Sequence, residues 1–191
     1  MSEITIEPAT SDRLADVERA LTGGGDGATC WCQWWMLAPK DFDALTHDER
    51  KERLAGDLAA PVASALLAYV EGDAAGWVKV APRPDQPRLA RTRAVQKSPE
   101  PMADPDVWAV TCFVVRKEHR GLGVANALLT AAVDHARRHG ARVVEGYPID
   151  TSERTASTND LYHGALSSFV AAGFVETVRP GASRPIVARE V

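Results

Sequence analysis

Apolar and polar residues along the chain alternate in two rhythms, one typical of strands and one typical of helices. Ile4 and Ile6 alternate with polar neighbours, which predicts a short first strand. Leu14, Val17 and Leu21 recur at helical spacing, which predicts a helix directly after that strand. The chain is therefore expected to begin with a strand followed by an amphipathic helix.

The next region predicts a second helix and then a pair of strands. A capping box at 46–49 marks the start of a helix whose apolar face holds Leu54 and Leu58. Residues 65–71 and 76–81 are typical of two strands, and the Gly-Asp pair between them is a hairpin signal. We therefore expect these two strands to pair antiparallel.

Residues 82–105 as a whole show neither a helical nor a strand-like pattern of apolar positions. The stretch holds six prolines, and only residues 89–95 favour a short strand. Its basic residues are Arg83, Arg88, Arg91, Arg93 and Lys97. We favour a surface excursion between strands over the alternative, a basic lip beside a cofactor or an acidic substrate, although loops of this length often carry function.

The centre of the chain has the strongest pattern. Residues 107–115 form a continuous apolar run that is typical of a strand buried on both faces. A helix is predicted from about 121 to 139, where Gly140 is a natural stop, and 142–147 predict the next strand. This succession of strand, helix and strand predicts a parallel pair with a right-handed crossover.

The C-terminal part is expected to close the fold. A last helix is predicted at 161–172 with Gly173 as its end, and a strand begins at 174–175. A turn is expected at 179–181, and residues 185–191 supply a terminal strand. The elements together predict a mixed α/β domain.

Length, charge and cysteine content narrow the class of protein. With 191 residues and 45% apolar content, the chain can form one domain with a sizeable core. A net charge of -4 gives no general attraction to nucleic acid or to an anionic membrane, and no apolar run approaches the roughly 18 residues of a membrane span. The chain starts without a basic and apolar leader, and its three cysteines are an odd number, so we expect reduced thiols and a cytoplasmic protein.

Residues 30–36 concentrate three of the five tryptophans beside Cys30 and Cys32. One interpretation is a packed aromatic cluster beneath a loop, and the other is a wall on the substrate side, because tryptophan offers a large rigid face. The two cysteines supply only two zinc ligands, and no second Cys or His pair follows at metal spacing, so no metal site is expected. A nucleophilic cysteine has no basic group near it in the sequence to support it.

The turn at 120–125, Arg-Gly-Leu-Gly-Val-Ala, opens the predicted central helix. Free backbone N–H groups at a helix start carry partial positive charge, and Gly121 and Gly123 let a phosphate approach them closely. No Gly-Lys-Ser/Thr follows, and Asn126 replaces the third glycine of the dinucleotide fingerprint. The turn therefore indicates a pyrophosphate site that belongs to neither of these classes.

Residues 115–129 resemble the acetyl-CoA motif of the GNAT acyltransferases. The family pattern Arg/Gln-x-x-Gly-x-Gly/Ala is met by Arg120, Gly123 and Ala125, and a lysine stands where a proline is usual before it. A second family element, a late helix that closes in a Gly-Phe pair, is met at 169–174. The order of the other predicted strands and helices also suits that family.

The resemblance implies a single GNAT-like domain over residues 1–191, with a mixed central sheet of about six or seven strands, splayed at the cofactor site, and about four flanking helices. Residues 1–60 would supply the acceptor-side helices and loop. Residues 107–147 would bind acetyl-CoA, and 159–191 would supply the closing helix and the last strands. The resemblance further implies acetyl-CoA as co-substrate and direct transfer to an amine, with no enzyme nucleophile.

By the same resemblance, the central strand would hold the pantetheine arm and the turn would hold the pyrophosphate. One N–H of that strand would polarise the thioester carbonyl. The implied cofactor-binding residues are Phe113, Val114, Val115, Arg120, Gly121, Leu122, Gly123, Val124 and Ala125.

The proton-transfer residues depart from the family pattern. Phe169 stands where the family usually has a tyrosine, and it has no proton to give. Tyr162, earlier on the same predicted helix, either takes the acid role or only packs. Glu145, near the carboxyl end of the second parallel strand, is the candidate base or else one half of a surface ion pair, and Tyr147 competes for either role.

The leading hypothesis is an acetyl-CoA-dependent N-acetyltransferase that acts on a primary amine of a small amino-acid-like or antibiotic-like molecule. A non-catalytic CoA-binding sensor is an alternative, motivated by Phe169. Acetylation of a protein or peptide is another, which the tryptophan-rich segment disfavours because it suggests a closed pocket. A homodimer is compatible with the sequence, and no nucleic-acid, membrane or metal partner is expected.

Overall fold

A single seven-stranded sheet organises the chain. The computed structural model describes residues 3–153, 155–157 and 160–191, so Asn159, the first residue of the predicted closing segment, lies outside it. The strands are β1 (Ile4–Pro8), β2 (Ala65–Val70), β3 (Asp73–Pro82), β4 (Val107–Val115), β5 (Val143–Gly146), β6 (Val175–Gly181) and β7 (Arg184–Glu190). Their order is β1-β2-β3-β4-β5-β7-β6, in which β4 and β5 pair in parallel and the other neighbours antiparallel.

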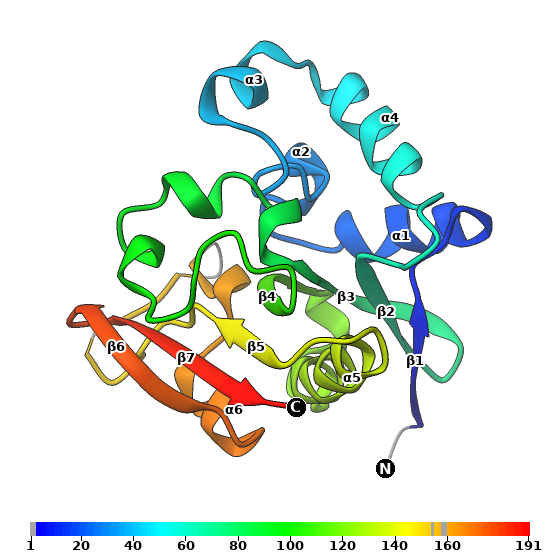
Figure 1. The fold of residues 1–191 in the computed structure, drawn as a ribbon. Helices are drawn as coiled ribbons and strands as arrows, with labels where there is room; N and C mark the ends of the chain where they lie inside the picture. The colour runs from blue at the N-terminus through cyan, green and yellow to red at the C-terminus, as the bar shows by residue number, and fades with distance from the viewer. Residues whose placement is uncertain (1–2, 154, 158–159) are drawn as a thin grey trace.

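Helices cover both faces of this sheet (Figure 1). They are α1 (Leu14–Leu21), α2 (Gly27–Cys30), α3 (Pro39–Ala44), α4 (His47–Asp57), α5 (Val124–Arg138) and α6 (Leu166–Ala171). The predicted α/β class and the seven-stranded mixed sheet are confirmed. The α-helices number six in the described residues, more than the four expected, because residues 27–44 fold into two short helices that carry no long apolar period. Among the residues described, no helix is both long and apolar enough to cross a membrane.

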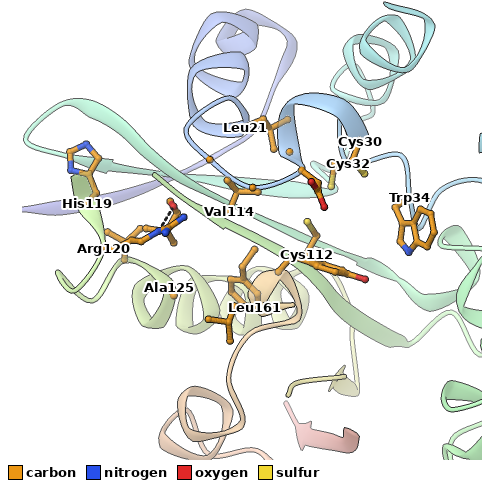
Figure 2. A pocket seen from close by; sticks show the side chains of 18 of the residues that line it. Leu21, Cys30, Cys32, Trp34, Cys112, Val114, His119, Arg120, Ala125 and Leu161 are labelled. Atoms are coloured by element: carbon orange, nitrogen blue, oxygen red, sulfur yellow. Dashed lines mark hydrogen bonds between the residues drawn. The ribbon is translucent and has the colours of Figure 1, made fainter. Parts of the chain in front are cut away.

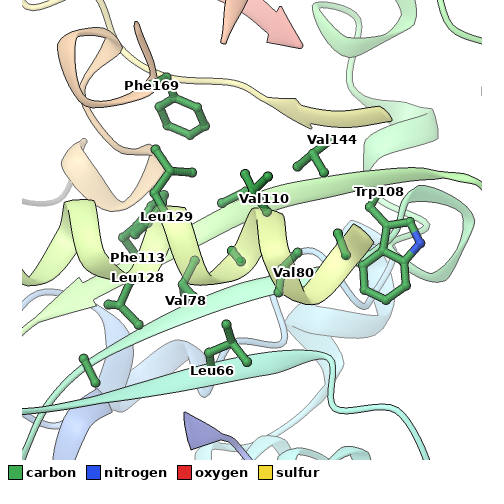
Figure 3. Packing of buried hydrophobic residues seen from close by; sticks show 14 of the residues in the cluster. Leu66, Val78, Val80, Trp108, Val110, Phe113, Leu128, Leu129, Val144 and Phe169 are labelled. Atoms are coloured by element: carbon green, nitrogen blue, oxygen red, sulfur yellow. The ribbon is translucent and has the colours of Figure 1, made fainter. Parts of the chain in front are cut away.

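Alternating side chains of the central strands build two separate cores. On β2, Leu66 and Ala68 face the layer that contains α5, and Leu67 faces the layer that contains α1 and α4. Figure 3 shows the first of these cores, where Leu128 and Leu129 of α5 pack over the sheet. The period-two pattern of a strand therefore decides which helix each residue meets.

The capping box predicted for the second helix is confirmed. The Thr46 hydroxyl accepts a hydrogen bond from the Glu49 amide, and the Glu49 carboxylate accepts one from the Thr46 amide at 2.7 Å. Reciprocal bonds of this kind satisfy two N–H groups that a helix start otherwise leaves unpaired. The local sequence alone thus fixes where α4 begins.

The segment between β3 and β4 differs from its prediction. It contains no strand at 89–95 and instead forms three 3₁₀ turns, Arg83–Asp85, Leu89–Arg91 and Val95–Lys97. The amides of Arg91 and Thr92 donate to carbonyl oxygens three residues earlier in the chain, and not to a neighbouring strand. The segment is also not a simple surface excursion, because Arg83, Leu89 and Val95 are fully buried.

The C-terminal prediction also needs two corrections. The predicted helix at 161–172 is divided into a 3₁₀ turn, Leu161–His163, and α6, because Gly164 adopts a φ of +80° between them. The turn expected at 179–181 lies at 182–183, since β6 continues to Gly181. Both errors concern boundaries and leave the order of the elements unchanged.

The parallel pair at the centre of the sheet separates early. Only Val107 to Val110 of β4 pair with β5, which ends at Gly146. Beyond Val110, no described strand pairs with that side of β4. The predicted splay of the sheet is confirmed, and it leaves the backbone of the second half of β4 open on one side.

Candidate active site

The main cavity of the protein lies along the open half of β4 and has a volume of about 790 Å³. Its walls come from β4, from the turn before α5, from the glycine-rich loop after α1 and from the tryptophan-rich segment. In Figure 2, Arg120 and Trp34 lie at opposite ends of the cavity and Cys112 lies between them. One continuous cavity therefore connects the glycine turn at 120–125 to the tryptophan-rich segment.

The turn before α5 forms one end of this cavity. Gly121 and Gly123 have φ angles of +78° and +88°, and a Cβ added at either would meet nothing within 4 Å. In the part of the chain that the structure describes, the backbone amides of residues 121–126 donate no hydrogen bond. A row of unpaired N–H groups at the start of a 15-residue helix fits a pyrophosphate, which carries acceptor oxygens and negative charge.

Arg120 lies at the same end and is held in place by the strand. Its Nε donates a hydrogen bond to the carbonyl oxygen of Val115 at 3.2 Å, drawn as the dashed line in Figure 2. The side chain is exposed, so its charge can meet a phosphate without a large desolvation cost.

Eight of the nine predicted cofactor-binding residues line the cavity: Phe113, Val114, Val115, Arg120, Gly121, Gly123, Val124 and Ala125. The ninth, Leu122, does not line it, and its side chain is among the exposed large hydrophobic side chains. The structure brings these residues together, and their binding to a cofactor stays a prediction.

The tryptophan-rich segment divides between the two interpretations given to it. Trp34 and Trp35 line the cavity, and the Trp35 Nε1 donates to the carbonyl oxygen of Thr111 on β4 at 3.1 Å. Trp31 instead lies in the core, where its Nε1 donates to Nε2 of His47 at 2.9 Å. Trp31 is thus part of a packed cluster, whereas Trp34 and Trp35 form a wall of the cavity.

The three cysteines line this cavity, and Cys112 is half-buried there. The Cys32 Sγ accepts a hydrogen bond from Nε1 of Trp77 at 3.2 Å. A hydrogen bond from Cys112 lowers the pKa of Cys32, and the same contact, together with burial, raises the pKa of Cys112. Lys79, which is buried and lies opposite Cys112 in the sheet, also lowers the pKa of Cys32. Sequence spacing does not indicate this contact, because Lys79 lies far from Cys32 along the chain.

Tyr162 lies on the 3₁₀ turn before α6 and lines the main cavity. Burial, and then the nearby Cys112, raise the pKa of Tyr162 to about 12. The phenol therefore keeps its proton at neutral pH, as a general acid must.

Phe169 has a different environment, although the family pattern places the tyrosine there. Its side chain is fully buried, forms no part of the cavity wall and meets the rings of Phe113 and Phe174 edge-on. A Cβ added at Gly146 would clash with the Phe169 ring, so the ring packs directly against the backbone of β5. A hydroxyl on this ring would enter the apolar core, so the position provides no acid here (Figure 3).

The position of Glu145 corrects our expectation that it lies beside the reacting group. Its carboxylate is fully buried and accepts hydrogen bonds from Nη1 of Arg83 at 2.7 Å and from the Tyr147 hydroxyl at 3.0 Å. Glu145 lines neither the main cavity nor a smaller cavity next to it. The register of β5 turns this side chain toward the 82–105 segment, which supplies Arg83 and Ser98. Its surroundings are those of a structural ion pair, and they give no support to the base role.

Two cavity residues were missed by sequence reasoning. Asp26, in the glycine-rich loop, is the only carboxylate among the described residues that line the main cavity. His119 also lines it, and its Nε2 lies 3.1 Å from a carboxylate oxygen of Asp73. A glycine-rich loop gives no sequence signal for the direction in which its single acid points.

Comparison with known proteins agrees with this geometry. The model of the acetyltransferase (GNAT) family matches residues 30–162, which is more than half of the chain. No curated protein matches the chain. The fold is similar to a GCN5-related N-acetyltransferase from Kribbella flavida (15% identity, 98% of each chain covered, TM-score 0.56).

Two similar structures contain coenzyme A. One is the PaiA N-acetyltransferase from Thermoplasma acidophilum (14% identity, 99% of each chain covered, TM-score 0.54). The other is the diaminobutyrate acetyltransferase EctA from Paenibacillus lautus, in complex with L-2,4-diaminobutyric acid and coenzyme A (16% identity, 100% of this chain and 96% of that chain covered, TM-score 0.54). At these identities the likeness shows the fold alone.

Proposed function

The chain belongs to the acetyltransferase (GNAT) family, and on that premise we propose that it transfers an acetyl group from acetyl-CoA to a primary amine of a small molecule. The observation that carries this proposal is the row of unpaired amides at residues 121–126 beside the open half of β4. The cavity continues from there to the aromatic wall of Trp34 and Trp35, whose large rigid rings suit the contact surface of a small acceptor.

The residues present fit acetyl-CoA. The amides of residues 121–126 and Arg120 would hold the pyrophosphate, and the open edge of β4 from Phe113 to Val115 would hydrogen-bond the pantetheine arm. The thioester supplies the acetyl group. An N–H on the open edge of β4 would stabilise negative charge on the thioester oxygen during transfer.

Two side chains would move protons. Tyr162 would donate its phenolic proton to the departing thiolate, because its raised pKa keeps that proton bound until it is needed. Asp26 is the carboxylate in the cavity that could take a proton from the attacking amine. In this scheme the amine nitrogen bonds the acetyl carbon directly, so the cysteines need no covalent role.

Calorimetric titration with acetyl-CoA, followed by thiol release with a panel of primary amines, tests the proposal. We expect micromolar binding and turnover of at least one small amine. The absence of acetyl-CoA binding would contradict the proposal, and so would turnover confined to peptides.

A second candidate, a CoA-binding sensor without catalysis, is favoured by one observation, the buried phenylalanine at the tyrosine position. It predicts acetyl-CoA binding without thiol release for any amine. Turnover that falls in the Tyr162→Phe variant would refute it.

A further inference from the structure

A second cavity of about 370 Å³ lies behind the aromatic wall of the first. The two cavities share Trp34, Trp35 and Tyr162, which line both of them. Most of the other residues that line the second cavity come from the 82–105 segment and from the start of β7. A molecule that reaches past the shared aromatic residues would therefore extend from the reaction space into this second cavity.

Three arginines, Arg88, Arg91 and Arg184, line this second cavity, and none of its described lining residues is acidic. Among the described residues, none of these three arginines forms an ion pair. Most of the ion pairs that the described residues do form involve another arginine. The protein as a whole carries a net charge of -4, so three unpaired guanidinium groups around one small cavity are not a consequence of composition. Their field favours an anion.

Arg88 is the most informative of the three because it is 93% buried, with a relative exposure of 7%. Its guanidinium stacks on the Trp34 ring at 3.6 Å, and its Nε donates to the carbonyl oxygen of Leu37 at 3.1 Å. Its Nη2, also buried, has no hydrogen-bond partner among the described residues. Asp43 acts on this group only at longer range. A buried, unsatisfied and charged donor is costly, and a bound oxyanion would satisfy it.

The backbone keeps Arg88 in this position. Its amide donates to the carbonyl oxygen of Trp35 at 3.3 Å, so the 82–105 segment is tied to the aromatic wall. The stacked guanidinium is thereby pre-organised and loses little freedom when a ligand binds.

We infer that the second cavity is the anion subsite of the acceptor, and that the enzyme prefers primary amines that carry a carboxylate. The carboxylate would bind Arg88 and Arg184 while the amine reaches the main cavity past Tyr162. This inference rests on the proposed function for the amine end. The carboxylate end follows from the three unpaired arginines alone.

The test compares each of a panel of L-amino acids with its carboxamide, in which the carboxylate is replaced by a neutral group of the same shape. We expect kcat/KM to be at least about tenfold higher for the acid in the pairs that turn over, because only the carboxylate can accept charged hydrogen bonds from the arginines. Arg184→Gln and Arg88→Lys are expected to remove most of this preference, because each should lower kcat/KM for the acid much more than for the carboxamide. Arg93→Gln, an exposed change of the same charge outside the cavity, is the matched control and keeps the preference.

Equal turnover of acids and carboxamides would overturn the inference and leave the proposed function intact. If no amine turns over, quenching of tryptophan fluorescence by the same acids and carboxamides, with coenzyme A present and absent, decides the matter. Carboxylate binding that Arg184→Gln weakens at least about tenfold supports the subsite even if acetyl-CoA fails to bind, which would remove only the proposed function. Equal binding of both members of each pair, or binding of neither, would overturn the subsite.

Discussion

The two halves of the site are built by different means. The proposed cofactor half comes from one short stretch, from the end of β4 to the start of α5, and the groups that we propose bind the pyrophosphate there are mainly backbone amides. The acceptor half comes from segments that are far apart in the sequence, and its groups are side chains such as Trp34, Arg88 and Tyr162. The first half depends mainly on free backbone amides and on glycines that leave room for a ligand, whereas the second depends on which side chains are present. Acceptor specificity can therefore change without loss of the cofactor site.

The largest effect is expected from a residue that belongs to neither half. Glu145→Gln should lower the free energy of unfolding by about 3–5 kcal/mol, because it leaves Arg83 buried without a charged partner. Urea denaturation measures this loss. Glu176→Gln, which breaks the exposed pair with Arg179, is the control and should cost at most about 1 kcal/mol.

The same variant tests the catalytic alternative for Glu145. Molecules of Glu145→Gln that remain folded should keep the kcat of the unchanged protein. A large fall in kcat in a fully folded sample would restore the base role.

The next effect concerns the acceptor half alone. Tyr162→Phe should lower kcat by about 100-fold or more, because it removes the proposed acid, and it should leave the Kd for acetyl-CoA unchanged. Steady-state kinetics and calorimetry measure the two quantities. Tyr69→Phe removes a phenol that donates to Asp16 outside the cavity and should change neither. Unchanged turnover in Tyr162→Phe would exclude the acid role.

Two glycines with the same backbone geometry allow an effect on cofactor binding to be distinguished from an effect on stability. Gly123 and Gly140 flank α5 with φ angles of +88° and +87°, and each has open space where a Cβ would stand. Alanine at either should cost about 1–2 kcal/mol of backbone strain. Only Gly123→Ala should also weaken acetyl-CoA binding, by about tenfold, since only its amide borders the proposed pyrophosphate. Equal affinity of both variants for acetyl-CoA would argue against a pyrophosphate site at residues 121–126.

The smallest effect lies at the far end of the same helix. Burial lowers the pKa of His135 below its ordinary value of 6.5, and the neighbouring His139 and Arg138 lower it further, against a hydrogen bond to Ala63 that raises it. The unfolded chain therefore binds a proton at a pH at which the folded protein does not, so stability should fall as the pH drops below 6.5. Unfolding in urea at neutral and acid pH should show a smaller fall in His135→Gln, with acetyl-CoA binding unchanged.

How much the sequence predicts follows the same division. The period-two strands, the capping box at Thr46 and the glycine turn at 121–123 are local signals, and the structure places all of them as expected. The splay of the sheet and most of the cofactor wall also follow from this one stretch, through its resemblance to a family.

The acceptor half could not be predicted because its contacts are non-local. Arg83 meets Glu145, and Arg88 stacks on Trp34, only after the irregular 82–105 segment has folded across the sheet. No periodic sequence pattern predicts these contacts, because prolines and 3₁₀ turns determine the path of that segment. Charge alone identified it as basic, but could not tell a buried structural arginine from one that lines a cavity.

An NMR titration with coenzyme A tests the central claim most directly, because the claim concerns individual backbone amides. The ¹H–¹⁵N signals of residues 121–126 should shift most on addition of coenzyme A. The signals of the last turn of α5, at the opposite end of the helix, should not shift. Largest shifts elsewhere in the chain, with residues 121–126 unchanged at saturation, would contradict the assignment of this turn as the pyrophosphate site.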